Sequence, residues 1–357
     1  QEILPSGGVD LKTHIDKTIQ LSLEKRLVDG IERYGAKGGT AIVMDPKTGA
    51  VLWMSSFKSY EHEKYSEYTN ENFKNPAVSD IFEPGSIFKV LVMAAGLDAE
   101  VVEPDTKCDI CGSPLKVDKY FIRTWNNEYE KDRTMMDVII NSDNVGMSFV
   151  GQKLGADLLY DYLAKFGIGS ETGVDLQGEA TGRLRERGTW NIVDLATTSF
   201  GQGVSTTPLQ MVRAVGAIAN DGVIATPQVV DRLVGEGWEE DIKPVYGERV
   251  ISEKAAKEIT AMMAEAAKGG EAKWTHTGGF RVAGKTGTAQ IPIAGHYDED
   301  KTIASFVGFA PYNDPEFVML VTLREPQTSP WASETAAPLW YSIARDLFIY
   351  FGVQTQP

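Results

Sequence analysis

Apolar residues recur at every fourth position near the start of the chain, over residues 13–34. The positions that carry this repeat are Ile15, Ile19, Leu23, Leu27 and Ile31. Residues four apart lie on the same face of a helix, so the pattern predicts an amphipathic helix. Thr13 precedes the first apolar position and is a suitable N-cap, which places the predicted start of the helix there.

Shorter apolar runs of about five residues predict strands at both ends of the chain. Two of them, Thr40–Met44 and Ala50–Met54, flank the turn sequence Asp-Pro-Lys-Thr-Gly and predict a β-hairpin. Further strands are predicted at Phe280–Ala283, Thr302–Ala310 and Glu316–Leu323.

Helical patterns fill most of the chain between these strands. Residues 81–97 are apolar nearly all round after Ser86, which is typical of a buried helix. Other helices are predicted within 134–220, including one with Thr207 as N-cap and Pro208 in its first turn, and at 252–267 and 336–350. Residues 59–80 and 100–133 show no period and are expected to be loop and irregular structure.

Strands at both ends with helices between them predict an α/β protein of the α+β type. One sheet would be assembled from segments far apart in sequence, with an inserted helical lobe.

Composition narrows the classes of function. The chain has 357 residues, of which 42% are hydrophobic and 24% charged, and its formal net charge is −15. This acidity argues against a nucleic-acid partner, because such binding needs clustered Lys and Arg. The longest apolar run, near residues 90–97, is far shorter than the roughly 20 residues that a membrane span requires. Because the chain begins with Gln1, we expect a fragment or processed form from which an upstream anchor is missing.

Two cysteines, Cys108 and Cys111, lie three positions apart in a segment that reads as a loop. A disulfide, two free thiols and a metal site all remain open from this spacing. A metal site would need further ligands, and no other cysteine exists to supply them. We therefore predict no metal centre.

A serine followed three positions later by a lysine is a candidate nucleophile with its base, but the pattern occurs four times. The pairs are Ser22 with Lys25, Ser55 with Lys58, Ser86 with Lys89, and Ser113 with Lys116. Only Ser86 follows a Pro-Gly pair at the expected start of a buried helix, where backbone N–H groups favour developing negative charge. Lys89 would lie on the same helix face, and burial would lower its pKa toward the neutral form that a base needs.

Two further motifs follow downstream. Ser142-Asp143-Asn144 precedes a helical pattern, and a short turn there could direct Ser142 and Asn144 into a cleft. Lys285-Thr286-Gly287-Thr288 comes directly after the strand predicted at 280–283. Its lysine would be the neighbouring cation that keeps Lys89 neutral, its threonines could hold a carboxylate, and Gly287 would let a ligand lie close to the strand. The same Lys-Thr-Gly sequence also occurs at 47–49, in the hairpin turn.

In this order the three motifs resemble those of penicillin-binding proteins and serine β-lactamases. DPKTGAVLWM, FEPGSIFKV, SFGQGVSTTPLQM and VAGKTGTAQ resemble the transpeptidase domain of class B penicillin-binding proteins, and LATTSFGQGVSTTPLQM favours the division-type branch. The resemblance implies an antiparallel sheet flanked by helices, with an inserted helical lobe. Residues 37–357 would form the transpeptidase domain, and residues 1–36 a linker and N-terminal helix from a missing upstream region.

The resemblance also implies a peptidoglycan D,D-transpeptidase that works without a cofactor. Ser86, Lys89, Ser142 and Lys285 would be catalytic, with Ser86 forming an acyl-enzyme. Asn144, Thr286, Gly287 and Thr288 would bind substrate, and the backbone N–H groups of Ser86 and Thr288 would stabilise the oxyanion.

The implied ligands are peptidoglycan stem peptides and β-lactam antibiotics. A glycosyltransferase and proteins of the divisome or elongasome would bind through the missing regions. The enzyme would lie on the extracytoplasmic face of a bacterial membrane, anchored by an N-terminal helix absent from this chain.

Two alternatives have different sequence requirements. A class A β-lactamase needs a deacylating glutamate in a Glu-x-x-Leu-Asn pattern, which does not occur here, and Glu179 and Glu186 stand in a different context. A β-lactam-sensing domain would share the three motifs. A non-catalytic cell-wall scaffold would be expected to have lost the nucleophile or the base, and both are present.

Overall fold

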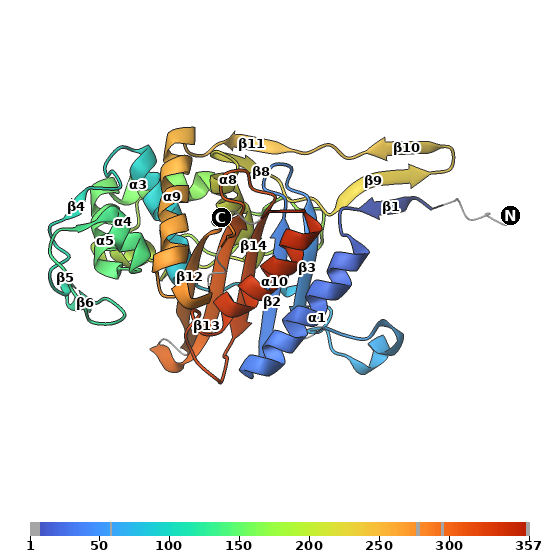
Figure 1. The fold of residues 1–357 in the computed structure, drawn as a ribbon, viewed down its shortest axis with the longest axis horizontal. Helices are drawn as coiled ribbons and strands as arrows, with labels where there is room; N and C mark the ends of the chain where they lie inside the picture. The colour runs from blue at the N-terminus through green and yellow to red at the C-terminus, as the bar shows by residue number, and fades with distance from the viewer. Residues whose placement is uncertain (1–7, 58, 276–278, 294–295, 355–357) are drawn as a thin grey trace.

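A computed structural model of the chain describes all residues except 1–7, 58, 276–278, 294–295 and 355–357. A central sheet has helices on both faces, a helical lobe stands beside one edge, and a narrow arm projects away from the other side (Figure 1). No helix among the described residues is both long and apolar enough to cross a membrane.

The central sheet has five antiparallel strands in the order β12-β13-β14-β2-β3. These are β2 (Gly38–Met44), β3 (Val51–Phe57), β12 (Ala283–Ile293), β13 (His296–Ala310) and β14 (Phe317–Arg324). The first and last thirds of the chain meet where β14 pairs with β2, with Val321 opposite Ala41. The prediction of one sheet built from distant segments, with a hairpin at its start, is confirmed.

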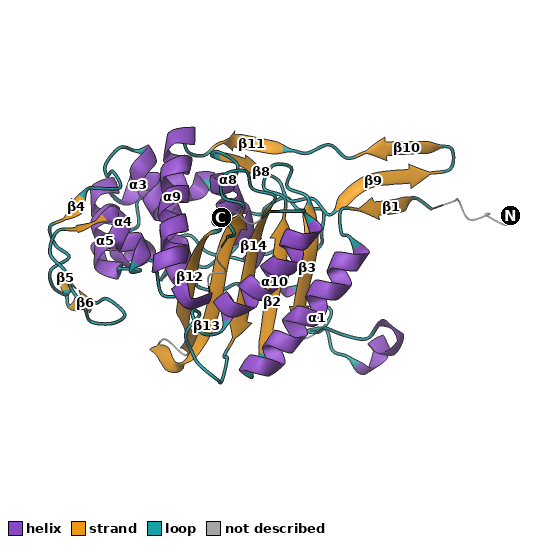
Figure 2. Ribbon diagram, in the orientation of Figure 1, coloured by secondary structure: helices purple, strands orange, loops and turns teal. Residues whose placement is uncertain are grey.

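Successive residues of the central strands face two different cores. Ala41 and Val43 pack with α1 (Lys17–Tyr34) and α10 (Ala336–Tyr350), which lie across one face of the sheet in Figure 2. Ile42 and Met44 point to the other face and join the core that contains α8 (Pro208–Ala219). Because both faces are covered, β2 is buried along its whole length, which explains its continuous apolar sequence.

The first helix begins later than predicted. Asp16, and not Thr13, is the N-cap of α1, because its carboxylate accepts from the backbone N–H of Thr18 at 2.8 Å and of Ile19 at 3.0 Å. Thr13 belongs instead to β1 (Asp10–Thr13), whose backbone pairs with another strand.

The predicted division of the chain assigned α1 to the segment before residue 37. Its apolar face is nevertheless part of the core between the sheet and α10. The boundary at residue 37 stays a prediction, and residues 1–7 of the predicted linker lie outside the described residues.

The lobe beside β12 is helical, as predicted. It contains α3 (Lys89–Asp98), α4 (Met135–Ile140), α5 (Asn144–Leu154), α6 (Ala156–Lys165) and α7 (Ile192–Thr198). Helix α9 (Glu253–Gly269) packs against α3, α4 and β12, and so joins the lobe to the edge of the sheet.

The buried helix expected at 81–97 starts later, with a 3₁₀ turn η2 (Gly85–Phe88) that leads into α3. The predicted start was wrong because Phe82 forms an isolated antiparallel bridge with Thr206, so the chain is not yet helical there. The prediction of burial is confirmed, since every residue from Lys89 to Leu97 is buried.

The segment expected to be irregular carries four short strands, β4 (Lys107–Cys108), β5 (Leu115–Val117), β6 (Tyr120–Ile122) and β7 (Arg133–Thr134). Cys108 and Cys111 are both fully buried and form a disulfide, which decides among the three interpretations of the pair. No group of metal-ligating side chains occurs among the described residues.

The predicted loop at 59–80 contains two short helices, η1 (His62–Glu67) and α2 (Pro76–Ser79). The remaining elements had no sequence-based prediction. They are the arm, in which β9 (Val230–Gly235) pairs with β1 and β10 (Trp238–Asp241), the pair β8 (Val223–Ala225) and β11 (Tyr246–Arg249), and the turn η3 (Lys273–Thr275).

Candidate active site

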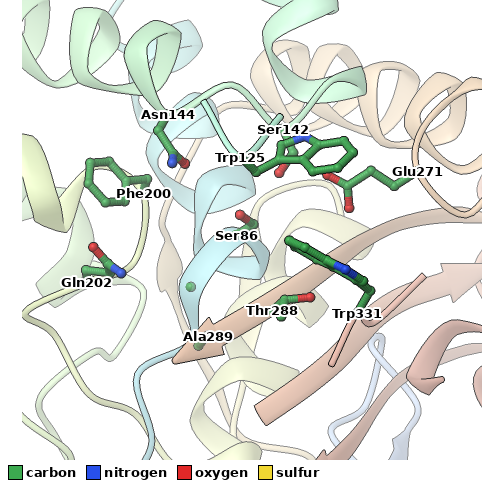
Figure 3. Close-up of a pocket in the computed structure, with 11 residues that line it drawn as sticks. Ser86, Trp125, Ser142, Asn144, Phe200, Gln202, Glu271, Thr288, Ala289 and Trp331 are labelled. Carbon is green, nitrogen blue, oxygen red and sulfur yellow. The ribbon is translucent and has the colours of Figure 1, made fainter. Parts of the chain in front are cut away.

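A cleft opens where the helical lobe meets the β12 edge of the sheet, and the three motifs meet there. Ser86, Ser142, Asn144 and Thr288 line it, and Figure 3 shows Ser86 between the side chains of the lobe and Thr288 on β12. The cleft is also lined by Gly85, Trp125, Phe200, Gln202, Glu271, Ala289 and Trp331.

Ser86 lies in the turn η2, held by a loop that follows α7. Gly85 has a φ of +54°, and its N–H donates to the Gly201 carbonyl at 3.0 Å. A Cβ on Gly201 would lie 2.1 Å from the Gly85 carbonyl oxygen, so the approach of these two backbones requires glycine at 201. The Ser-Phe-Gly-Gln-Gly sequence at 199–203 thus supports the turn that carries Ser86.

Lys89 is fully buried at the start of α3 and connects the first motif to the second. Its Nζ donates to the Ser142 carbonyl at 2.6 Å, to Ser142 Oγ at 3.2 Å and to Asn144 Oδ1 at 2.7 Å. Burial, and then the positive charge of Lys285, lower the pKa of Lys89 to about 7, against the opposing effect of Glu271 and Asp143. Among hydrogen bonds between described residues, Lys89 has none to Ser86, so the predicted contact is not formed in this arrangement.

The second motif is a turn before α5, and its three residues have different environments. Ser142 is buried with a φ of +55°, a strained conformation for a residue other than glycine. Asp143 faces away from the cleft: it caps α5 and pairs with Arg133 at 3.0 Å. Asn144 donates through Nδ2 to the Arg123 carbonyl at 2.9 Å. The turn therefore brings Ser142 and Asn144 to the cleft, as predicted, and Asp143 fixes it.

The third motif lies within β12, and the prediction that it follows a strand ending at residue 283 was wrong. The backbone pairing between β12 and β13 runs through the motif, since Lys285 pairs with Val307 and Gly287 with Ser305. Lys285 is buried, and its Nζ donates to the carbonyl of Thr286 at 3.2 Å and to its Oγ1 at 3.3 Å. Burial lowers the pKa of Lys285, and Glu271 opposes that shift.

Gly287 has a packing role. A Cβ at this position would lie 2.8 Å from Ile87 Cγ2 and 3.0 Å from the Ile87 backbone nitrogen, so only glycine lets β12 pack this closely against η2. The expected approach of a ligand to Gly287 stays a prediction.

The other copies of the short motifs lie elsewhere. Ser22 and Lys25 are exposed on α1, and Ser113 and Lys116 are exposed near β5. Ser55 belongs to β3, and Lys58 lies outside the described residues. In the second Lys-Thr-Gly copy, Lys47 pairs with Asp314 at 2.6 Å on the surface. None of the described members lines the cleft.

Several residues of the cleft were missed from the sequence. Glu271 accepts a hydrogen bond from Thr286 Oγ1 at 2.8 Å, and Trp125 and Trp331 approach each other with ring centroids 5.6 Å apart. Gln202 could have been found, because it lies within the quoted sequence SFGQGVSTTPLQM. Glu271 and the two tryptophans belong to no motif and lie far apart along the chain.

The arrangement has the parts that nucleophilic catalysis requires. A serine stands at the start of a buried helix, a lysine three residues later has a depressed pKa, and a second lysine provides a nearby positive charge. The described residues of the cleft can thus support attack of a hydroxyl on a carbonyl carbon without a metal ion.

Comparison with known proteins gives a family for this arrangement. The family model described as "Penicillin binding protein transpeptidase domain" matches residues 39–347. The chain is 35% identical over 355 residues to stage V sporulation protein D of Bacillus subtilis, which covers 98% of this chain. It is 32% identical over 323 residues, 90% of this chain, to a probable peptidoglycan D,D-transpeptidase PenA of Neisseria meningitidis.

The fold agrees with these sequence matches. The crystal structure of penicillin-binding protein 3 from Mycobacterium tuberculosis in complex with aztreonam is similar with a TM-score of 0.91 and 29% identity. The match covers 98% of this chain and 81% of that one. The chain spans about half the length of the two curated relatives, 55% and 53% respectively.

Proposed function

The chain belongs to the transpeptidase-domain family of class B penicillin-binding proteins, and from this premise we propose that it is a serine-type peptidoglycan D,D-transpeptidase. It would cross-link stem peptides through an acyl-enzyme on Ser86 and be acylated by β-lactams at the same residue. The observation that carries the proposal is the buried Lys89, whose pKa of about 7 lets it act as a base near neutral pH.

Acylation would begin when neutral Lys89 takes the proton of the Ser86 hydroxyl as Ser86 Oγ attacks the carbonyl carbon of the penultimate D-alanine. The negative charge on the carbonyl oxygen would be stabilised by the backbone N–H groups of Ser86 and Thr288. The proton would then reach the nitrogen of the departing D-alanine through Ser142, which already contacts Lys89 Nζ.

The remaining cleft residues would hold the substrate. Asn144 would bind a backbone amide of the stem peptide, Thr286 and Thr288 the terminal carboxylate, and Gly287 would let the peptide lie along β12. Lys285 would keep Lys89 neutral by its positive charge. An amine of a second stem peptide would then attack the ester and form the cross-link, and the proton that this amine loses would pass through Lys89 to Ser86 Oγ and restore the free hydroxyl.

The partners and location follow from the family and go beyond this chain. We infer a role in the bacterial cell envelope, on the extracytoplasmic side, with a membrane anchor and contacts to a glycosyltransferase and to divisome or elongasome proteins supplied by other parts of the protein. One named relative is a sporulation protein and the other a probable peptidoglycan D,D-transpeptidase, which supports the envelope role.

The position of the glutamates favours this function over that of a class A β-lactamase. Glu179 is engaged by Thr172, whose N–H and hydroxyl donate to its Oε1 at 2.7 and 2.5 Å, and Glu186 is exposed. Neither lines the cleft around Ser86. A penicilloyl ester would therefore persist, because neither glutamate faces it and Glu271, which does line the cleft, is engaged by the Thr286 hydroxyl.

The test is to incubate the protein with a fluorescent penicillin and to locate the adduct by peptide mass mapping. We expect one adduct, on Ser86, that lasts for many minutes, and no labelling of a Ser86→Ala variant. Ser113→Ala, at an exposed copy of the motif, is the matched control and should label normally. Labelling that survives Ser86→Ala would refute the assignment, and rapid repeated turnover of the penicillin would favour a β-lactamase.

A further inference from the structure

Glu271 engages the hydroxyl of Thr286, which the proposed function needs to be free so that it can bind the carboxylate of a ligand. It lies between α9 and η3, is partly buried, and lines the same cleft as Ser86 and Thr288. Thr286 Oγ1 donates to Glu271 Oε2 at 2.8 Å. A hydroxyl has a single proton to donate, so while this bond exists Thr286 has none for a ligand.

The other groups around Thr286 are arranged as a chain of donors. Lys285 Nζ approaches Thr286 Oγ1 at 3.3 Å, and Thr286 in turn donates to Glu271. The carboxylate of Glu271 thereby partly offsets the positive charge of Lys285, with the Thr286 hydroxyl between the two groups. Thr288 differs, because its Oγ1 accepts from the Ala332 N–H at 3.0 Å and donates to no other residue that the structure describes.

We propose that Glu271 determines the charge selectivity of the cleft: its carboxylate occupies the position on Thr286 that the terminal carboxylate of a ligand would take, and an anionic ligand must displace it. The inference rests on the proposed function, in which Thr286 and Thr288 bind that carboxylate. Two carboxylates near one hydroxyl repel each other, and the repulsion is strong in a partly buried site.

A ligand without the negative charge would meet no such repulsion. Glu271 would therefore lower the reactivity of Ser86 toward acyl donors that end in a free carboxylate, relative to neutral donors of the same shape. Glu271 also raises the pKa of Lys89, but charged and neutral donors share that effect, so a difference between the two donors reports ligand selection.

The test compares Glu271→Gln with wild type, using benzylpenicillin and its uncharged methyl ester as matched ligands. Glutamine keeps the hydrogen-bond acceptor and removes the charge. We expect the second-order acylation rate with benzylpenicillin to rise about tenfold, which equals about 1.4 kcal/mol. The rate with the ester reports the effect that both ligands share through the pKa of Lys89, and it should change much less. Glu271→Ala also frees the Thr286 hydroxyl, so its rate with benzylpenicillin should be at least as high.

Glu265→Gln is the matched control. Glu265 pairs with Lys268 at 3.1 Å on the exposed side of α9, so its removal changes the net charge equally without touching the cleft. Both ligands should react with it as with wild type. Circular dichroism and thermal unfolding would establish that each variant is folded.

The outcomes separate the two hypotheses. Equal changes of both ligand rates in Glu271→Gln, or a fall in both, would overturn the inference and assign Glu271 to supporting the charge of Lys285. Such a result leaves the proposed function intact, since Ser86 would still be acylated. A wild-type protein that no penicillin acylates would overturn the proposed function, and the inference with it.

Discussion

Lys89 and Lys285 are both buried in the cleft, although an ammonium group loses strong hydration when it leaves water. Burial disfavours the protonated form of each lysine, and the charge of Lys285 lowers the pKa of Lys89 further. Glu271 raises the pKa of both and so limits the shift. The balance leaves Lys89 with a pKa of about 7, close to the pH at which a base is most useful.

This balance predicts the pH dependence of acylation. Only neutral Lys89 can accept the Ser86 proton, so the acylation rate should rise with pH through about 7 and then level off. Lys285 would also support the proposed proton path through Ser142, so the rate should fall again at higher pH as Lys285 loses its proton. This second step should lie below the ordinary lysine pKa because burial lowers it. The measurement is the second-order rate with a fluorescent penicillin across the pH range in which the protein stays folded.

The control is the circular dichroism spectrum at each pH, which separates loss of structure from loss of a protonated group. A profile that is flat through pH 7 would argue against Lys89 as the base. A rate that falls as pH rises through 7 would mean that the protonated amine is required.

The lysine pair also illustrates how far single residues could be predicted. The apolar run around residues 81–97 was sufficient to predict that Lys89 is buried and that its pKa is depressed. The missing bond between Lys89 and Ser86 was not predictable, because the helix spacing permits it. Lys89 turns instead to acceptors on the following motif, Ser142 and Asn144, which only the packed lobe supplies.

Among secondary-structure elements, the contact between β12 and η2 positions Ser86, the proposed nucleophile. Gly287 faces Ile87 and Pro84, and a Cβ there would lie 2.8 Å from Ile87 Cγ2 and 3.2 Å from the Pro84 carbonyl oxygen. Ser86 lies between these two residues on the turn. The distance between the strand and the turn therefore decides how Ser86 meets the groups on β12.

We predict that Gly287→Ala destabilises the protein and slows acylation together. An added methyl group against backbone atoms typically costs about 1–3 kcal/mol, because neither η2 nor β12 can shift freely. Urea unfolding would measure the change in stability, and the acylation rate would report the displacement of Ser86.

Gly269→Ala serves as the comparison for this substitution. Its Cβ would have only Ile140 Cγ2 near it, at 4.0 Å, so the unfolding free energy should stay close to that of wild type. If Gly287→Ala were as stable and as active as Gly269→Ala, the strand and turn would not be in tight contact.

A helix or strand was predicted accurately where its own residues carry the pattern that defines it, and inaccurately where a distant segment determines its bounds. The predicted helix at 336–350 has the same bounds as α10, because its pattern of apolar residues is complete within the helix itself. The predicted strand at 280–283 was displaced, because β12 owes its length to pairing with β13 rather than to its own Gly- and Thr-rich sequence. The start of the helix containing Ser86 was misplaced for a related reason, the bridge from Phe82 to Thr206.

At the scale of the whole molecule, the cleft has two walls that come from different parts of the fold. Trp125 follows β6 in the helical lobe, and Trp331 lies between β14 and α10 on the side of the sheet. Their rings meet at 5.6 Å beside the cleft, and both remain 42–48% exposed (Figure 3). A ligand that enters between the walls would contact one or both rings.

Acylation by a penicillin should therefore change the intrinsic tryptophan fluorescence of the protein. Trp125→Phe and Trp331→Phe should each lose part of the change, and the double variant most of it, because both rings report on the filling of the cleft. Trp238→Phe is the control, since this exposed residue lies on β10 in the arm, away from the cleft. A signal lost in Trp238→Phe but kept in the other two variants would contradict the placement of the cleft between the walls.

The sequence by itself determined part of the local structure and the family. Spacing of apolar residues along the chain predicted the longer helices and the strands of the central sheet other than β12, and three short motifs predicted Ser86, Lys89 and the family. Periodicity and motifs depend on neighbours in the chain, so they can be recognised without the fold.

Only the tertiary structure decided which distant residues share the cleft. The hydrogen bond from Thr286 to Glu271, the meeting of Trp125 with Trp331, and the fit of Gly287 against η2 all join separate segments. No local pattern encodes such contacts, because they depend on how the lobe and the sheet pack through α9. The same packing buries Lys89 and Lys285 beside each other, and so lowers the pKa of Lys89. The Ser-x-x-Lys pattern to which Lys89 belongs occurs four times in the sequence and does not by itself predict that shift.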